Sequence, residues 1–380
     1  LMAWELNYSR WVDVTYGSMV ARVGEERARE LYPGWPAGAP TIITGNQRQN
    51  NLNSLGQQLL DADCSYRELM GNGAFESGSN AWVVAGSRSA SGKPILANDP
   101  HLVLMAPGRW YEVQLSSPNL DVTGASIPGS PFVVIGRNRN IAWGVTNAMF
   151  DDQDFYVEEV DSVLHPTMYR LGEEWRPVLK DVDTILIKDE LPIVLTSYRT
   201  HRGPVVNRIE PSTDVVSDLL TMRWTGHEVS NDVRAFLMIN RARSWKEFRD
   251  ALKHFNGPAQ NFVYADAGGN IGYQTGGKLP RRPVNRLTGP LPGNRVEFDW
   301  EGFVPFEEMP RVFNPPEGYI VTANNRIVHE SYPYYISQHW EPEWRAGRIV
   351  DLIKRYERCS VEDFQRFQID LLSLHAWQIV

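Results

Sequence analysis

The feature that most constrains the fold of this 380-residue chain is a change of pattern near residue 79. Residues 33–78 are rich in Gly, Pro, Asn, Gln and Ser, and residues 47–53 are almost wholly polar. This composition is typical of an exposed connector. After Ser79 the chain changes to short runs of β-favouring residues that are separated by turn residues. The sequence therefore predicts a connector that leads into a large system of β-strands.

The predicted elements indicate a mixed fold. Helical spacing of apolar residues predicts a helix over residues 1–31, and Ser244 with Glu247, like Ser360 with Asp363, has the spacing of a helix-capping box. A further helix is expected at 232–240. Strands are expected at 82–87, 110–116, 132–135, 184–187 and 193–198. Because helices interrupt the strands without strict alternation, we expect an α+β fold with largely antiparallel sheets.

Composition excludes some classes of partner. The net charge of -8 offers no basic face for a phosphate backbone, so nucleic acid is not an expected partner. No apolar run approaches the roughly 20 residues of a membrane helix, and no signal peptide is visible. Both ends of the sequence are expected to fall inside structure, as in a fragment of a longer protein. Small-molecule substrates remain open.

The Gly78-Ser79 pair carries the central chemical hypothesis. A serine hydroxyl is a poor nucleophile without a base, but an N-terminal serine can use its own α-amine, whose pKa near 8 leaves a useful neutral fraction. Gly78, which has no Cβ, tolerates the strained backbone needed for the Ser79 hydroxyl to attack the Gly78 carbonyl. An ester shift and hydrolysis would then free Ser79. Taken alone, however, Gly-Ser in such a segment is typical of an ordinary linker.

Downstream residues favour the chemical interpretation. A strand predicted at 94–97 leads into Asn98-Asp99-Pro100-His101-Leu102. Together with Gly78-Ser79, this segment resembles the penicillin acylase family of N-terminal nucleophile hydrolases, which includes cephalosporin acylases and acyl-homoserine lactone acylases. The histidine at position 101 suggests the cephalosporin and lactone acylases rather than the penicillin G branch of the family. The resemblance implies a four-layer αββα sandwich that is activated by autoproteolysis at Gly78–Ser79.

The resemblance also divides the chain. It implies that residues 1–32 are the C-terminal part of a helical small subunit, that residues 33–78 are a connector including an excised spacer, and that residues 79–380 are a large-subunit catalytic part. The two subunits of one precursor would then be each other's partners after processing. Relatives are generally periplasmic or secreted, and the resemblance implies the same for this chain.

Further matches imply an oxyanion hole. Ile141–Asn147 resembles the family segment whose last residue offers a backbone N–H, here that of Asn147. The segment 260–266 resembles the one whose asparagine side chain, here Asn261, is the second donor. Two donors aimed at a developing alkoxide are what amide cleavage needs. His101 would hold the hydroxyl and amine of Ser79 in line, and Arg282, or Arg281 by an offset of one, would support Asn261.

The family's acyl-pocket positions fall on Leu102, Ile135 and Val145. All three are aliphatic, which favours aliphatic acyl chains over phenylacetyl groups, although core packing explains each residue equally well. The small-subunit contribution should come from residues 2–6, where the match assigns no single residue.

A calcium site is also implied. Asp151 and Asp154 would supply carboxylates and Gln153 its backbone carbonyl, whereas Val14, with Asp13 adjacent, stands where the family has a glutamate. Calcium takes six to eight oxygens, so other ligands are needed. An acidic, solvated turn is the alternative. No organic cofactor is implied.

The expected activity is hydrolysis of a linear acyl amide, such as a β-lactam side chain or an acyl-homoserine lactone. The alternative is a relative that keeps the fold but is never processed and serves as a binding scaffold. A conventional serine hydrolase lacks support, because no Gly-x-Ser-x-Gly elbow is followed by suitably placed acid and His residues.

Overall fold

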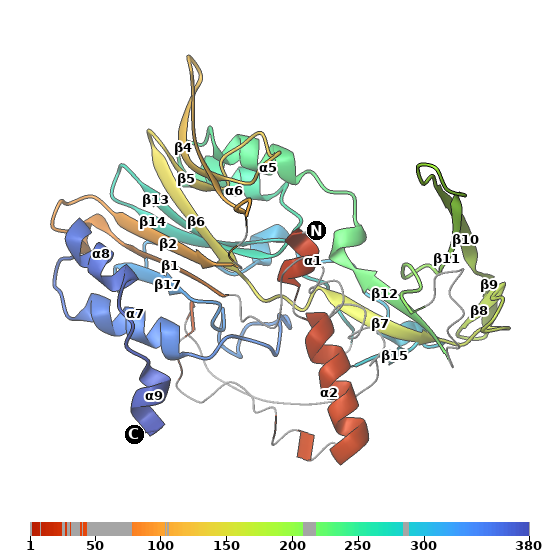
Figure 1. Cartoon of the computed structure of the whole chain (residues 1–380). Helices are drawn as coiled ribbons and strands as arrows, with labels where there is room; N and C mark the ends of the chain where they lie inside the picture. The colour runs from red at the N-terminus through yellow and green to blue at the C-terminus, as the bar shows by residue number, and fades with distance from the viewer. Residues whose placement is uncertain are drawn as a thin grey trace.

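Figure 1 shows the computed structural model of the chain. It describes residues 2–7, 9–24, 27–28, 31, 39, 41–43, 78–102, 104, 106–207, 218–283 and 289–379. Most of the predicted connector, residues 33–78, lies outside the described residues. Where it is described, it is tied to the sandwich, because Ile42 and Ile43 donate backbone hydrogen bonds to the carbonyls of Arg326 and Ile327.

Two antiparallel sheets face each other across an apolar core. The smaller sheet has the order β17-β1-β2, with β1 at Gly78–Val84, β2 at Ile95–His101 and β17 at Tyr319–Thr322. The larger has the order β16-β14-β13-β6-β5-β4-β3. Its strands span Tyr111–Ser117 (β3), Leu120–Ser126 (β4), Ile135–Asn138 (β5), Ile141–Asn147 (β6), Gln260–Asp266 (β13), Ile271–Gly276 (β14) and Arg311–Phe313 (β16).

Alternation along β1 shows why this strand lies between two layers. Ala81 and Val83 join the core between the sheets. Trp82 and Val84 point the other way, into a second core with helices α7 (Trp344–Lys354) and α8 (Val361–Gln368). Successive side chains of a strand point to opposite faces. A strand that is apolar on both faces is therefore covered on both.

The outer face of the larger sheet is covered by α5 (Asp232–Ile239) and α6 (Trp245–Leu252). The Ser244 side chain accepts from the Glu247 N–H at the start of α6, as its spacing predicts. Helices, two antiparallel sheets and helices again form four layers (Figure 1). The predicted α+β, αββα fold is confirmed.

The remaining elements lie beside the sandwich. A third sheet has the order β12-β7-β15, and β8-β9 and β10-β11 form hairpins that project from it at the right of Figure 1. Their bounds are Gln153–Glu158 (β7), Met168–Leu171 (β8), Glu174–Pro177 (β9), Leu179–Ile185 (β10), Ile193–Arg199 (β11), Leu219–Trp224 (β12) and Leu291–Pro292 (β15). Short 3-10 helices span Gly86–Arg88, Thr225–His227, Val296–Phe298 and Phe306–Glu308, and α9 spans Leu374–Ile379.

Two local predictions were wrong. The single helix expected over 1–31 is divided at Asn7 into α1 (Met2–Leu6) and α2 (Ser9–Val23). The strand expected at 132–135 begins only at Ile135. Its apolar run is buried, but the backbone N–H and carbonyl of Val133 bond the side chain of Asn240, both at 2.8 Å. A side-chain partner therefore replaces the sheet ladder there.

Within the described residues, no helix combines the length and apolar character that crossing a membrane requires.

Candidate active site

Ser79 is the second residue of β1 and is 8% exposed. Because strand side chains alternate, it shares the inner face of β1 with Ala81 and Val83. Its backbone N–H donates to Oδ1 of Asn324 over 2.7 Å. The predicted nucleophile is thus held in the wall between the two sheets, and its nitrogen has a defined partner.

Gly78 leaves room for a neighbouring arginine. It lies in a regular strand and is not among the described glycines with positive φ. A Cβ at residue 78 would meet Nη2 of Arg345 at 3.0 Å, a tight contact. The absence of a side chain lets the Arg345 guanidinium lie against the peptide that precedes Ser79.

A buried asparagine network joins Ser79 to the predicted oxyanion donors. Asn324 Nδ2 donates to the carbonyl oxygen of Asn147 over 3.0 Å, and Asn261 Nδ2 donates to the same oxygen over 3.2 Å. Asn324 follows β17 and has φ of 63°, a left-handed conformation that Asn tolerates better than most residues. Three chain segments therefore meet at the carbonyl of Asn147.

Strand register sets the direction of the Asn147 N–H. Ala148 N–H donates to the carbonyl of Ala259, so the adjacent pair, Asn147 and Gln260, is not a hydrogen-bonded pair of the ladder. The Asn147 N–H therefore points away from β13. On that same edge, the Val145 N–H donates to Oδ1 of Asn98 over 2.8 Å.

Asn261 is fully buried, and its amide orientation is fixed by neighbours on both sides. Nδ2 donates to the hydroxyl oxygens of Thr146 and Thr322 over 3.0 and 3.1 Å. The Tyr273 hydroxyl donates to Oδ1 over 2.6 Å. The side chain thus presents its N–H groups toward β6, the strand that carries Asn147.

Among the described residues, the hydrogen bonds of Arg282 and Arg281 go to groups other than Asn261. Arg282 Nε donates to Asp154 over 2.7 Å, and its Nη2 donates to the Asp151 carbonyl over 3.0 Å. Arg281 bonds the carbonyl of Glu301 instead. Arg282 is thus bound to the nearby acidic segment. The described hydrogen-bond partner of Asn261 Oδ1 is the Tyr273 hydroxyl.

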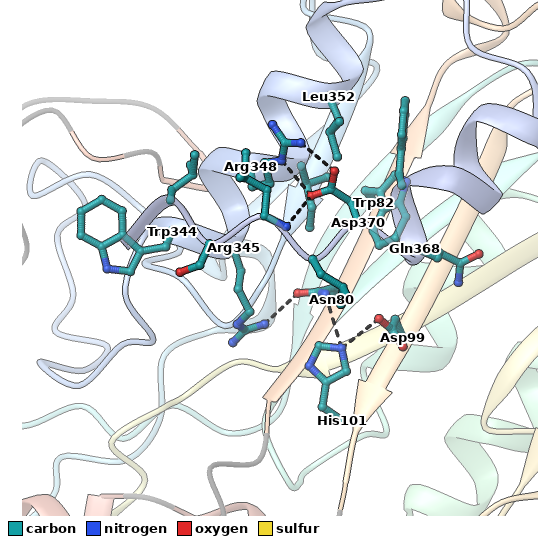
Figure 2. A pocket seen from close by; sticks show the side chains of 16 residues that line it. Asn80, Trp82, Asp99, His101, Trp344, Arg345, Arg348, Leu352, Gln368 and Asp370 are labelled. Carbon is teal, nitrogen blue, oxygen red and sulfur yellow. Dashed lines mark hydrogen bonds and ion pairs between the residues drawn. The ribbon is translucent and has the colours of Figure 1, made fainter. Parts of the chain in front are cut away.

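His101 also differs from expectation. It is paired in register with Gly78 and lies on the outer face of the smaller sheet, one residue out of phase with the inner face of Ser79. Its Nε2 contacts Asp99 Oδ2 at 2.8 Å and Asn80 Nδ2 at 3.4 Å (Figure 2). The hydrogen bond from His101 lowers the pKa of Asp99 below its ordinary value. Direct alignment of the Ser79 hydroxyl by this side chain is not supported.

A cavity of about 170 Å³ opens beside Ser79. Leu102 and Val145 line it as predicted, but Val134 takes the place expected for Ile135, and Leu6 is the contribution from the first helical segment. The walls also include aromatic rings, from Trp110, Phe132, Phe236 and Phe255. The cavity therefore has both aliphatic and aromatic walls.

Acidic residues form a second buried cluster. Ligand oxygens of Asp13, Asp151 and Asp154 lie within 4.8 Å of one another, so these three residues could hold a metal ion. Burial raises the pKa of Asp151 to about 7, and burial with the nearby carboxylates of Asp151 and Asp154 raises that of Asp13. Arg282 pairs with Asp151 and Asp154. With all three carboxyl groups ionised, this single guanidinium would leave a negative charge that a cation could balance.

Asp13, not Val14, thus supplies the carboxylate from α2. Gln153 lies in β7, directly before Asp154, and its buried side-chain Oε1 has no hydrogen-bond partner among the described residues. Its amide nitrogen contacts the sulfur of Met222.

Sequence reasoning missed three residues around Ser79. Asn324 lies 245 residues from Ser79, and Arg345, which donates to the Ser79 carbonyl, lies 266 residues away. Tyr273 lies on β14, whose residues are all buried, so the sequence gives no sign that its hydroxyl bonds Asn261. The Asn324-Asn325 pair after an apolar run was the only local signal, and such a pair predicts a turn rather than a site.

The chain is similar to a known protein family and to several of its members. Residues 1–380 match the family model described as Penicillin amidase. The chain is 33% identical over 313 residues to Penicillin acylase 2 proenzyme of Pseudomonas sp., which covers 81% of this chain. It is 32% identical to Acyl-homoserine lactone acylase QuiP of Pseudomonas aeruginosa over 78% of the chain, and 32% identical to Penicillin G acylase of Escherichia coli over 77%.

Among solved structures, a thermostable penicillin G acylase from Alcaligenes faecalis matches with a TM-score of 0.65 and 27% identity, over 76% of this chain and 51% of that one. The chain spans only 40%, 36% and 34% of the three relatives named above. The match of the family model over the whole chain, with the fold of that structure, shows that the chain belongs to the penicillin amidase family.

Proposed function

We propose that this protein hydrolyses linear acyl amides, with Ser79 as an N-terminal nucleophile. The observation that carries the proposal is the link from the Ser79 nitrogen through Asn324 to the Asn147 carbonyl and on to Asn261. The names of the relatives, penicillin acylases and an acyl-homoserine lactone acylase, agree with this reaction class.

The arrangement of these residues supports the following mechanism. The Ser79 hydroxyl oxygen attacks the amide carbonyl, and its proton passes to the Ser79 α-amine through a water. The Asn147 N–H and Asn261 Nδ2 stabilise the oxyanion. The C–N bond breaks, the amine leaves with the proton, and a water hydrolyses the acyl ester. Asn261 must exchange a threonine acceptor for the oxyanion in this step.

Activation uses the same hydroxyl before the α-amine is free. The Ser79 oxygen attacks the Gly78 carbonyl, the Gly78–Ser79 C–N bond breaks as the ester forms, and water cleaves the ester. The hydrogen bond to Asn324 holds the nitrogen that leaves. The printed name of one relative, a proenzyme, agrees with such a step.

The substrate should carry an apolar acyl group, because the cavity next to Ser79 has aliphatic and aromatic walls. The mixture of Val145 and Leu102 with aromatic rings suits either an alkyl chain or a flat ring. A panel of hexanoyl, decanoyl and phenylacetyl amides, with an acyl-homoserine lactone, would distinguish these acyl groups.

Replacement of Ser79 tests the proposal. Ser79→Ala should leave a folded, uncleaved chain without amidase activity, whereas the control Ser117→Ala, at an exposed end of β3, should be processed normally. Intact mass should show a piece that begins at Ser79 only in the wild type and the control. Turnover by Ser79→Ala, or a wild-type protein that stays whole, would refute the mechanism, and the latter would favour a scaffold.

We also propose that the acidic cluster binds Ca²⁺. The carboxylates of Asp13, Asp151 and Asp154, and the Gln153 carbonyl, would hold the ion, which prefers oxygen ligands. A divalent cation would balance the charge that Arg282 leaves uncompensated. Its chemistry would be structural, since the ligands come from α2 and from the segment at β7.

A further inference from the structure

Arg345 reaches from α7 to the segment around Ser79. Its Nη1 donates to the Ser79 carbonyl over 2.9 Å. The same atom donates to Asn80 Oδ1 over 2.7 Å (Figure 2). Its Nη2 donates to Asn324 Oδ1 over 3.1 Å. One guanidinium therefore contacts the backbone of the proposed nucleophile and both asparagines beside it.

The side-chain oxygen of Asn324 is shared by the Ser79 nitrogen and the Arg345 guanidinium. Asn324 Oδ1 accepts from the Ser79 N–H over 2.7 Å and from Arg345 Nη2 over 3.1 Å. Because Arg345 holds the Oδ1 end, Asn324 cannot turn its NH₂ group toward Ser79, and Nδ2 stays on the Asn147 carbonyl. The nitrogen that cleavage would convert to an α-amine thus has a fixed acceptor and a permanent positive charge beside it.

A nearby positive charge disfavours the protonated form of an amine, and a neutral amine is what the base step requires. We propose that Arg345 is a positioning residue for the Ser79 amine: it orients Asn324 toward that nitrogen, and its charge keeps the freed amine neutral near pH 7. This inference rests on the proposed function, because it assigns a role in the same reaction.

Other charges around the amine also affect its pKa. Asp232, the first residue of α5, lines the same cavity as Ser79, and its carboxylate would favour the protonated amine. The Glu341 carboxylate, just before α7, lies 3.4 Å from Arg345 Nη2, so its negative charge partly offsets the effect of the guanidinium on the amine. On β2, Asp99 is paired with His101 on the outer face, beside Asn80. Of these groups, Arg345 alone shares a hydrogen-bond acceptor with the Ser79 nitrogen, so we expect the positive charge to dominate.

The pH dependence of kcat/KM in the matured enzyme tests this inference. Arg345→Met should move the acidic limb of the profile to higher pH by about one unit, the size of shift that a neighbouring charge typically causes. Arg345→Lys, which keeps the charge, should retain most of the wild-type position. Glu341→Gln should move the acidic limb to lower pH, because the charge of Arg345 is then less offset. This variant tests the inference even where the Arg345 variants fail to mature.

Two controls identify the group that titrates. Arg348→Met removes a cation one turn along α7 that pairs with Asp370 at 2.6 Å, and should leave the limb in place. His101→Gln should also leave it in place; loss of the limb in that variant would assign it to His101 and overturn the inference.

A merely structural role for Arg345 predicts a lower kcat at every pH with an unmoved limb in both Arg345→Met and Glu341→Gln, and that result would also overturn it. Failure of the proposed function is a separate outcome, since it would show as an unprocessed wild type or an active Ser79→Ala variant.

Discussion

Hydrogen bonds fix both ends of the Asn261 side-chain amide. Its Nδ2 lies within hydrogen-bond reach of two threonine hydroxyls and the Asn147 carbonyl, while Tyr273 holds Oδ1. An amide held at both ends loses little freedom when a transition state forms, which is the meaning of a preorganised donor. The cost of losing Asn261 should therefore fall on the chemical step.

We expect Asn261→Ala to reduce kcat by about 100- to 1000-fold with little change in KM, the range found when one oxyanion donor is removed. Steady-state kinetics on a chromogenic acyl amide would measure it. The variant leaves the Tyr273 hydroxyl without its described acceptor, so Tyr273→Phe, which keeps Asn261, is the matched control and should lose less. An Asn261→Ala enzyme with wild-type kcat would remove Asn261 from the oxyanion hole.

At the level of secondary structure, alternate residues of β1 face the cavity and the helix layer. Ser79 faces the cavity side, and Asn80, one residue later, faces α7 and Arg345. Helix α8 packs Phe364 and Phe367 into the core behind Trp82 of this strand. The helix layer therefore supports the strand that carries the proposed nucleophile.

The N-terminus of α8 offers a stability test. The Ser360 hydroxyl accepts from the Asp363 N–H, and the Asp363 carboxylate accepts from the Ser360 N–H over 2.7 Å, a complete capping box. Ser360→Ala should lower the free energy of unfolding by about 1 kcal/mol, as measured by urea denaturation. Val361→Ala, at a position that is 54% exposed, should cause no comparable loss. Equal destabilisation by both would show that the cap contributes nothing.

At the scale of the whole molecule, a few polar contacts fasten the first helical segment to the sandwich. The Asn147 side chain donates to the Leu6 carbonyl over 2.7 Å, and Asn7 donates to Asp152. Asp13 of α2 lies close to Asp151 and Asp154, and these carboxyl groups could be linked only through a bound cation. If cleavage separates the two parts, these contacts remain to hold them together. A cation in the acidic cluster would add to that attachment.

Removal of calcium should therefore lower thermal stability. A site saturated at 100 times its Kd contributes about 2.7 kcal/mol, so we expect EGTA to lower Tm by several degrees in differential scanning calorimetry and added Ca²⁺ to restore it. Asp13→Asn should abolish the calcium-dependent shift, whereas Asp351→Asn, exposed on α7, should keep it. An unchanged Tm in wild type would count against the site.

What the sequence determined by itself was local or carried by contiguous motifs. Capping boxes at Ser244 and Ser360 follow from residues three apart. The family and its four-layer fold followed from the motifs around Ser79, Asn147 and Asn261, because each of these motifs is continuous in the chain. Sheet pairing then brings Asn261 opposite Thr146, next to Asn147, as expected of neighbouring strands.

Tertiary structure alone decided the partners of these residues. Asn324 and Arg345 reach Ser79 from more than 240 residues away, and no local pattern encodes such a contact. The phase of β2 placed His101 on the outer face, and a one-residue difference likewise exchanged Ile135 for Val134 in the cavity. Strand and helix faces change with every residue, so a motif match names a residue, but only packing decides what its side chain touches.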